Sequence, residues 1–574
     1  MTRYRFIVLL LLCSACSHPA DELTIKPIAD DYWAWWQRTN PEAATQAGEY
    51  QYNDQLSDYS IAHSEAVKKE AAVLVARLKA LDAVKLDESG RLDHAILLGT
   101  LEDEIRSIDL KTYEMPVHQF DGVHIAIPQI ATYAPFDTVK HFEDYIARLH
   151  QVPDRLDQLT ATMRQGMRDK LMPPKYLLEK TVIQCRDLAA PAGEKSPFAA
   201  PVLHFADTIP AGDRQRLRDA LIAAVDKEVR PAYKKLEKFI AKEYAPQGRA
   251  DEGYWALPDG DERYRFNVHT QTTTAMTPEQ IHQLGLAQVA ELEAQITALA
   301  KSAGHADAKT FTKAVFADPK LKATSREQIL DNFRRYIDNM EPNLPQLFGR
   351  LPKGKLMVVS VPEYMEKDSS TQYIQGTPDG SRKGQVWVVT YDPTHHDVLD
   401  DEATAYHEGV PGHHLQIAIQ LELPLHPFHR SVGYNAFAEG WALYSERLGK
   451  EVGFYKNPAS DLGRLRSELF RAIRLVVDTG VHYKRWKRGQ MMAYFKEHFG
   501  DPQEVEVDRY IAIPGQALGY KVGQLKILAL RKKAQEKLGA KFDIRIFHDR
   551  VLGAGSVPLD VLEARIDSWI ASYR

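Results

Sequence analysis

Histidine and acidic residues gather in one short stretch of this 574-residue chain. Seven of its 21 histidines lie between His395 and His429, and Glu408 directly follows His407 at the centre of that stretch. Catalytic Zn²⁺ takes imidazole nitrogens and carboxylate oxygens as ligands and keeps one position for water. A carboxylate beside the metal can then act as general base. The stretch therefore predicts a zinc site at which Glu408 is the catalytic base.

The spacing of these histidines differs from that of HExxH zinc peptidases, whose two histidine ligands lie four residues apart on one helical face. Here the fourth residue after His407 is Pro411, and the next histidines are His413 and His414. A straight helix would separate them from His407 by roughly 9 and 10.5 Å along its axis. Pro411 removes a helical hydrogen bond, and Gly412 tolerates unusual dihedral angles. We therefore expect a break that returns His413, or else His414, toward His407, with His413 preferred.

The third ligand is predicted in the helical, aromatic-rich segment that begins at Asn435. There the aromatic side chains would pack into the core while Glu439 points inward. Glu446 lies two turns further along the same face, where it could hydrogen-bond a histidine ligand. We therefore expect one Zn²⁺ per chain, held by His407, His413 and Glu439.

Several motifs of this region resemble those of a bacterial family known as domain of unknown function 885. The clearest are HEGVPGHHLQ at 407–416, AFAEGWALYSE at 436–446 and RYIAIPGQALGYKVG at 509–523. The resemblance covers most of the mature chain and is strongest from about Tyr373 to the end. It implies a helical zinc peptidase of the gluzincin kind, with a glutamate ligand on a following helix. It also implies a deep cleft between two largely helical halves.

Analogy with gluzincins adds further groups to the predicted site. Tyr520 resembles the tyrosine that hydrogen-bonds the tetrahedral oxyanion in those enzymes. Arg474, Asp478 and His482 lie four residues apart on one helical face. We expect Arg474 and Asp478 to form an ion pair and His482 to face the cleft as a second oxyanion contact. An edge strand at 386–390 would pair with an extended substrate backbone.

The fold is predicted to be mostly α-helical. Apolar residues recur at helical spacing from Ile28 to about Tyr244, and Pro231 would kink one of these helices. The stretch 245–261, which contains Pro and Gly, looks like a join. It divides the chain into an N-terminal helical half, 27–260, and a catalytic half, 261–574.

Strand signals are confined to the region before the histidine cluster. Short β-branched runs lie at 356–361 and 386–390, and Pro378-Asp379-Gly380 marks a turn between them. We expect a small antiparallel sheet beside the zinc site. A new helix should begin with a capping box at Thr277–Gln280.

The N-terminus predicts export. Residues 1–16 combine two arginines, an apolar run and small residues, as in a signal peptide, and they end in a lipoprotein-like box at Cys16. Residues 17–26 would be a tether. The expected location is the periplasmic side of the outer membrane, with the membrane touched only through a lipid anchor at Cys16; the alternative is a soluble periplasmic or secreted protein.

Composition excludes other classes of function. The formal net charge of −5 gives no basic face for nucleic acid. Besides Cys13 and Cys16 the chain has only Cys185, so no disulfide framework is expected. The favoured function is a zinc peptidase that acts on short peptides. The alternatives are a zinc hydrolase of a non-peptide amide or ester, and a catalytically silent envelope lipoprotein that binds peptides or partners in the cleft. Oligomeric state is left open.

Overall fold

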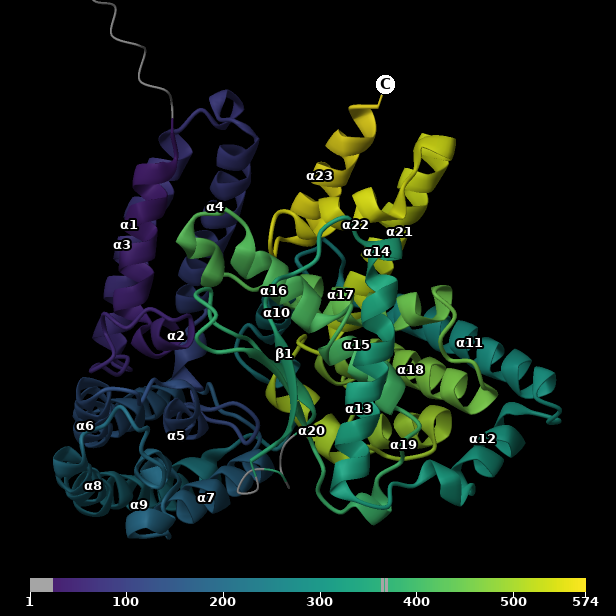
Figure 1. Ribbon diagram of the computed structural model, residues 1–574. Helices are drawn as coiled ribbons and strands as arrows, with labels where there is room; N and C mark the ends of the chain where they lie inside the picture. Colours follow the sequence, from purple (N-terminus) through teal and green to yellow (C-terminus); the bar gives the residue numbers. More distant parts are fainter. Residues whose placement is uncertain (1–23, 363–365, 367–369, 574) are drawn as a thin grey trace, which may run out of the picture.

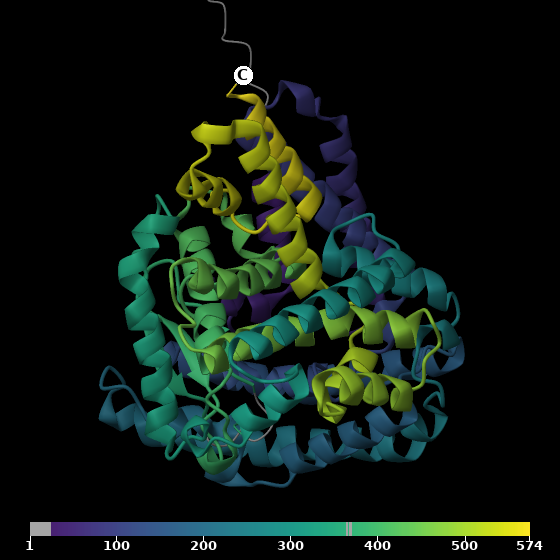
Figure 2. The same ribbon diagram turned by 90° about the vertical axis from the view of Figure 1, so that its right-hand side faces the viewer.

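The structure is a computed structural model that describes residues 24–362, 366 and 370–573. The predicted signal peptide, Cys16 and most of the tether lie outside the described residues. Helices dominate the rest of the chain, as expected (Figures 1 and 2). Within the described part, none of the helices is both long enough and apolar enough to cross a bilayer.

Helices α1 to α9 occupy the left side of Figure 1. In α3, the apolar residues at alternating spacings of three and four, from Val67 to Leu78, are buried as the pattern predicts. The interruption expected at Pro231 takes the form of a π-helical turn, Val225–Val229, immediately before α9. The elements are α1 (Lys26–Thr39), α2 (Pro41–Gln46), α3 (Ile61–Ala80), α4 (Glu88–Asp109), α5 (Val123–Tyr133), α6 (Val139–Asp169), α7 (Lys175–Ala189), α8 (Ala211–Ala224) and α9 (Arg230–Phe239).

The remaining helices lie between residue 260 and the C-terminal end of the described chain. Thr277 caps α11 in the predicted capping box with Gln280. These helices are α10 (Gly260–Thr272), α11 (Pro278–Ser302), α12 (Ala308–Phe316), α13 (Arg326–Met340), α14 (Leu344–Leu347), α15 (Asp401–Glu408), α16 (His413–Glu422), α17 (Asn435–Glu451), α18 (Pro458–His482), α19 (Arg488–Phe499), α20 (Glu504–Ala512), α21 (Leu518–Leu538), α22 (Ile544–Leu552) and α23 (Leu559–Ala571).

The sheet is mixed, so the prediction of an antiparallel sheet was wrong. Strands β1 (Leu356–Ser360) and β3 (Gly384–Val388) pair in parallel, and β2 (Gln372–Ile374) pairs antiparallel with β3 on its other side. A parallel pair needs a long crossover, and β2 lies within that crossover. Strand β3 is central, which also overturns the expectation that this strand is an edge open to substrate. The edge strands among the described residues are β1 and β2.

The hydrophobic cores do not divide at residue 260. One large cluster joins residues of α1, α3 and α4 to residues of α15, α17, α21 and α23. A second is confined to residues 56–245, and a third joins Leu177 to residues of α11 and α18–α20. The first helices of the chain therefore share a core with the C-terminal elements that carry the predicted zinc site.

Helices α17 and α21 approach each other closely at paired glycines. A Cβ atom at Gly523 would lie 1.8 Å from the backbone oxygen of Ala436, and one at Gly440 would lie 2.4 Å from the Cα of Gly523. Only glycine permits this approach. The contact holds the start of α21, with Tyr520, beside the part of α17 that carries Glu439.

Candidate metal centre

The helix break predicted after His407 is present. Helix α15 ends at Glu408 and α16 begins at His413. Gly412 turns so tightly that a Cβ atom there would lie 1.9 Å from the backbone oxygen of His407. The break brings the rings of His407 and His413 together, with their centroids 4.9 Å apart.

Helix α17 fixes the break from outside. The Val410–Pro411 peptide is cis, and the carbonyl oxygen of Pro411 accepts hydrogen bonds from Trp441 Nε1 at 2.9 Å and Ser445 Oγ at 3.1 Å. Both donors lie on the helix that carries Glu439. The same helix therefore positions the acidic ligand and the loop between the two histidines.

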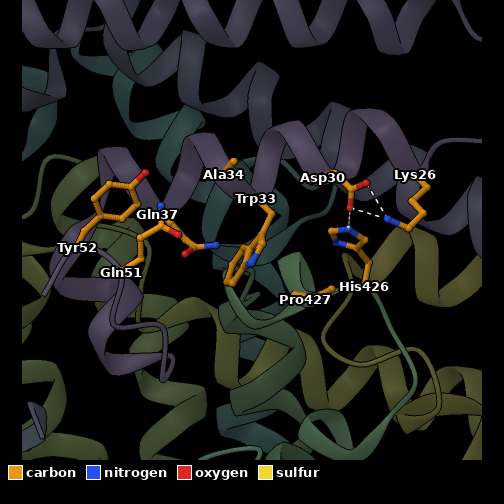
Figure 3. A pocket seen from close by; sticks show the side chains of 9 residues that line it. All are labelled: Lys26, Asp30, Trp33, Ala34, Gln37, Gln51, Tyr52, His426 and Pro427. Carbon is orange, nitrogen blue, oxygen red and sulfur yellow. Dashed lines mark hydrogen bonds and ion pairs between the residues drawn. The ribbon is translucent and has the colours of Figure 1, made fainter.

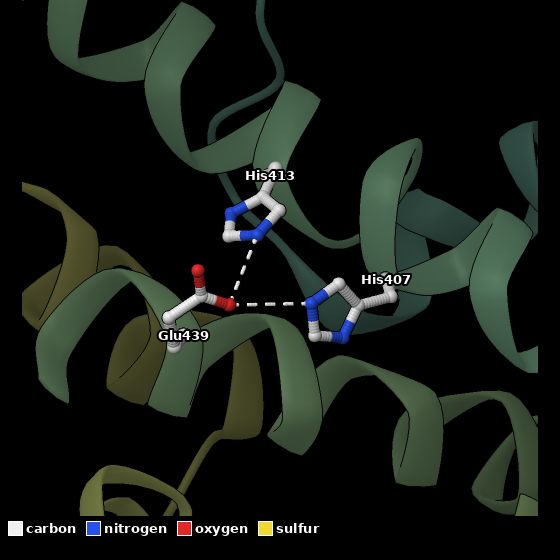
Figure 4. A group of neighbouring side chains, drawn as sticks. All are labelled: His407, His413 and Glu439. Carbon is white, nitrogen blue, oxygen red and sulfur yellow. Dashed lines mark ion pairs between the residues drawn. The ribbon is translucent and has the colours of Figure 1, made fainter. Parts of the chain in front are cut away.

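His407, His413 and Glu439 converge (Figure 4). One potential ligand atom from each lies within 4.8 Å of the other two. Glu439 Oε2 is 3.3 Å from His407 Nε2 and 3.4 Å from His413 Nε2. Ligand atoms about 2.0–2.1 Å from a tetrahedral Zn²⁺ lie about 3.3 Å apart. Charge-assisted hydrogen bonds would be shorter, about 2.7–2.9 Å. The spacing and the donor set therefore fit a shared zinc ion better than direct hydrogen bonds.

The burial of the cluster supports the same assignment. Glu439 Oε2 is a buried carboxylate oxygen without a hydrogen-bond partner among the described residues. Such an atom is costly unless something compensates its charge. The other nitrogen of His407, Nδ1, lies 2.8 Å from Glu446 Oε1, as predicted for a carboxylate that orients a histidine ligand.

The charges of the cluster are strongly coupled. Burial disfavours a charged His407, but the carboxylates of Glu439 and Glu446 outweigh it and raise the pKa of His407 to about 10. Burial also opposes ionisation of Glu439, yet the two nearby imidazoles hold its pKa well below the usual range. The carboxylates of Glu439 and Glu446 therefore favour a positive charge between them.

Glu408 is buried at the end of α15, next to the cluster. Burial raises the pKa of this carboxyl, whereas the positive charges of His407 and His413 lower it. Backbone hydrogen bonding from Tyr373 in β2 also lowers this pKa, which places Glu408 beside an edge of the sheet. A carboxylate with a raised pKa beside a metal can act as general base.

The choice between the two candidate histidines is decided by their contacts. His413 faces Glu439, whereas His414 Nδ1 is 3.1 Å from the hydroxyl of Tyr373. Burial lowers the pKa of His414 to about 4, so it stays neutral. His414 therefore connects α16 to β2 and does not join the cluster.

Tyr520 lies beside a predicted metal ligand. Its ring stacks on that of His407, with centroids 6.3 Å apart and planes at 18°. The guanidinium carbon of Arg474 lies 4.7 Å from the centroid of the Tyr520 ring. Arg509 Nη2 lies 3.5 Å from the Tyr520 hydroxyl. Tyr520 occupies the first turn of α21. A phenol in this position could donate to an oxyanion formed near His407.

His482 does not point its nitrogens at the cluster. Its Nδ1 accepts from the backbone N–H of Tyr254 at 3.1 Å, and its Nε2 donates to the carbonyl of Tyr510 at 3.0 Å. Burial lowers its pKa to about 3. Because both ring nitrogens hold backbone groups, His482 has no group left for a substrate oxygen, and we assign it a structural position.

The expected ion pair between Arg474 and Asp478 is also absent. Arg474 donates to the hydroxyl of Tyr510 at 2.8 Å and to Glu506 at 3.0 Å. Asp478 accepts from the hydroxyl of Tyr264 at 2.7 Å and from a backbone N–H of the loop before α21. Helical spacing places the two residues next to each other, but each hydrogen-bonds to residues of other elements instead.

The other histidines of the rich stretch have structural partners. His426 Nε2 is 2.9 Å from Asp30, and His429 Nε2 is 2.8 Å from Asp93. His426 also lines a pocket of about 320 Å³ beside α1, with Asp30 and Trp33 (Figure 3). None of the predicted site residues lines that pocket.

Sequence reasoning missed three contributors to the site. Tyr373 contacts both Glu408 and His414, Trp441 holds the helix break, and Arg509 reaches the hydroxyl of Tyr520. Trp441 lies within a quoted motif, and Tyr373 marks the start of the region where the resemblance is strongest, so their position in the sequence was a usable signal. Arg509 begins one of those motifs, but only tertiary packing shows what it contacts.

Comparison with known proteins identifies the family. The family described as a bacterial protein of unknown function, DUF885, matches residues 41–566. The chain belongs to the DUF885 family. The crystal structure of a candidate lipoprotein from Colwellia psychrerythraea is similar to this chain, with a TM-score of 0.91 and 29% identity over 96% of this chain and 100% of that one.

A second solved structure supports the fold alone. A candidate lipoprotein of unknown function from Shewanella oneidensis has a TM-score of 0.72 and 17% identity, covering 94% of this chain and 98% of that chain. No curated protein matched the sequence. The similarity to lipoproteins agrees with the lipoprotein-like box predicted at the N-terminus.

Proposed function

We propose that this DUF885 protein is a zinc-dependent hydrolase that cleaves peptide bonds in short peptides, with the zinc site of a gluzincin-like peptidase. The observation that carries the proposal is that Glu439 Oε2 lies 3.3 Å from His407 Nε2 and 3.4 Å from His413 Nε2. Only these three protein ligands converge among the described residues. A structural zinc site takes four protein ligands, whereas three leave a position for chemistry.

The residues around the cluster have separate roles. His407, His413 and Glu439 would hold the zinc ion, which would supply a Lewis acid able to acidify water and polarise a carbonyl oxygen. Glu408 accepts the proton from the attacking water and returns it to the leaving amine. Tyr520 donates a hydrogen bond to the developing oxyanion. Glu446 holds the ring of His407 in one orientation.

The sheet supplies a place for the substrate backbone. Strand β2 is an edge strand, and its Tyr373 lies against Glu408. An extended peptide that pairs with such an edge would present its amide bond to the base. We therefore assign pairing with the substrate backbone to β2, whereas the sequence predicted it for the strand at 386–390, which is β3.

The cellular setting is proposed from the N-terminus. We infer that the protein is exported and anchored by a lipid on Cys16 to the periplasmic side of the outer membrane. The alternative, a soluble periplasmic or secreted protein, differs only in the fate of Cys16. Mass spectrometry of the mature N-terminus distinguishes them, because a lipid on Cys16 adds a diagnostic mass.

Activity is tested by incubating the zinc-loaded protein with a mixed peptide library and reading products by mass spectrometry. Glu408→Gln is the matched variant, since it removes the base but leaves the three proposed ligands. Cleavage by the wild type alone supports the peptidase. If neither protein cleaves peptides although zinc is bound, the peptidase proposal is wrong, and the two alternatives, hydrolysis of non-peptide amides or esters and binding without catalysis, take its place.

A further inference from the structure

A second pocket, of about 320 Å³, lies between the N-terminal segments and the loop before α21. Its walls come from residues 110–121, 173–177 and 249–271 on one side and from 511–516 on the other. Both expected halves of the chain therefore contribute to it. A pocket of this size can take one or two residues of a peptide but not a folded protein.

Two arginines in its wall have no carboxylate partner. Arg249 and Arg263 donate only to backbone carbonyls: Arg249 to those of Met172, Asp251 and Glu252, and Arg263 to those of Leu110 and Pro258. Among the described residues, neither guanidinium lies within 4.0 Å of a carboxylate oxygen. A guanidinium has five N–H groups, so both arginines retain donors.

Neighbouring carboxylates act on these arginines only through space, and the ring of Tyr254 lies 5.5 Å from the guanidinium of Arg249. Arg263 is only 6% exposed, and burial lowers its pKa. Burial also lowers the pKa of Arg249 to about 10. The single carboxylate in the pocket wall, Asp121, is exposed to solvent and pairs with neither arginine. Largely buried cations that no carboxylate pairs with directly favour the binding of an anion.

The pocket lies within reach of the proposed zinc site. Gln516 forms part of its wall, and its carbonyl oxygen accepts from Asn435 Nδ2 at 2.7 Å. Asn435 precedes Glu439 by four residues in α17, a rise of about 6 Å along the helix. The pocket wall is therefore in direct contact with the helix that carries Glu439.

We propose that Arg249 and Arg263 bind a carboxylate near the C-terminal end of the peptide substrate, so that the enzyme removes one or two residues from that end. The inference rests on the proposed function, because it names the substrate class of the same site. The carboxylate could be the C-terminal group or an acidic side chain. Both would form charge-assisted hydrogen bonds with the guanidinium donors.

Binding of three probes separates these sources. Isothermal calorimetry would use full-chain Glu408→Gln, which cannot turn over, and three peptides: tetraalanine, tetraalanine amide, and the amide with glutamate as its last residue. We expect tetraalanine to bind about tenfold or more tightly than its amide. Recovery of tight binding by the glutamate-containing amide assigns the carboxylate to a side chain instead. Equal affinity for all three probes overturns the proposal.

A negative charge added in the pocket provides the matching variant. Gln271, a half-buried residue of the wall, becomes a carboxylate in Gln271→Glu, which leaves both arginines and their backbone bonds intact. In the Glu408→Gln background, we expect it to weaken tetraalanine binding about tenfold and to leave amide binding unchanged. Gln346→Glu, an exposed change outside the pocket, is the control. If Gln271→Glu affects neither probe, the pocket does not bind the carboxylate.

The outcomes distinguish this inference from the proposed function. Cleavage of library peptides by the wild type without preference for free C-termini overturns the inference but leaves the hydrolase. Carboxylate-selective binding without cleavage by the wild type overturns the hydrolase and leaves the pocket assignment.

Discussion

At the level of single residues, the proposed zinc site depends on which side chains reach the metal. His413 faces Glu439, whereas His414 contacts Tyr373. We expect His413→Ala to weaken zinc binding at least 100-fold, because a three-ligand site would lose one ligand. His414→Ala should retain one zinc per chain in elemental analysis. Loss of zinc from His414→Ala but not from His413→Ala would reverse the assignment.

Glu446 would affect the metal only through His407, because its Oε1 lies at hydrogen-bond distance, 2.8 Å, from His407 Nδ1. Replacement by glutamine keeps the shape but removes the charge that orients and polarises the imidazole. We expect Glu446→Gln to lower zinc affinity about 10–100-fold without unfolding the protein. A competitive chelator titration measures the affinity, and circular dichroism checks the fold. Unchanged affinity would mean that Glu446 is only a buried structural partner.

The sequence predicted these residues because each depends on local geometry. Helical periodicity placed Glu439 and Glu446 on one face, and Pro411 with Gly412 indicated the break that returns His413. Contacts made by distant elements were not predictable in this way. Arg474 pairs with Glu506 and not Asp478 because α20 packs against α18, which no local pattern shows.

At the scale of elements, the break between α15 and α16 is the feature on which the site depends. A Cβ atom at Gly412 would lie 1.9 Å from the carbonyl oxygen of His407. We expect Gly412→Ala to force the loop apart, to destabilise the protein by about 2 kcal/mol or more, and to abolish zinc binding. Gly433→Ala is the matched control, because a Cβ there meets no atom within 4 Å.

Denaturant unfolding and zinc content together measure this effect. If Gly412→Ala binds zinc as the wild type does, the tight turn is not what positions His413. The helices themselves were largely predictable from periodicity. Strand β2 was not, because its three residues carry no pattern of their own and pair only once β3 is in place.

At the scale of the whole molecule, buried neutral histidines make stability depend on pH. His548 donates from Nδ1 to the carbonyl of Leu347 and accepts the hydroxyl of Tyr444 at Nε2. Burial lowers the pKa values of His548 and His482 to about 3 from an ordinary 6.5. The unfolded chain therefore binds more protons below pH 6.5, and stability is lost as pH falls from 6.5 toward 3.

As pH falls from 7.5 to 5.5, protonation of each of these histidines in the unfolded chain should lower the free energy of unfolding by about 1.4 kcal/mol. His548→Gln removes one titrating group. The variant should therefore lose about 1.4 kcal/mol less free energy of unfolding over that pH interval than the wild type does. Urea unfolding of both proteins at the two pH values measures the difference. Equal losses would show that His548 is not held neutral in the folded protein.

The division into halves illustrates the limit of sequence analysis at this scale. The stretch 245–261 looks like a join, yet α1, α3 and α4 share a hydrophobic core with α17 and α21. Composition marks where a chain can turn, but it does not show which distant apolar faces meet.

The metal assignment is tested by anomalous X-ray diffraction at the zinc absorption edge, on crystals of the zinc-loaded protein. We expect one strong peak per chain, about 2.0–2.2 Å from His407 Nε2, His413 Nε2 and a carboxylate oxygen of Glu439, with no fourth protein ligand. A peak elsewhere, a fourth protein ligand, or no peak between these three side chains would contradict it.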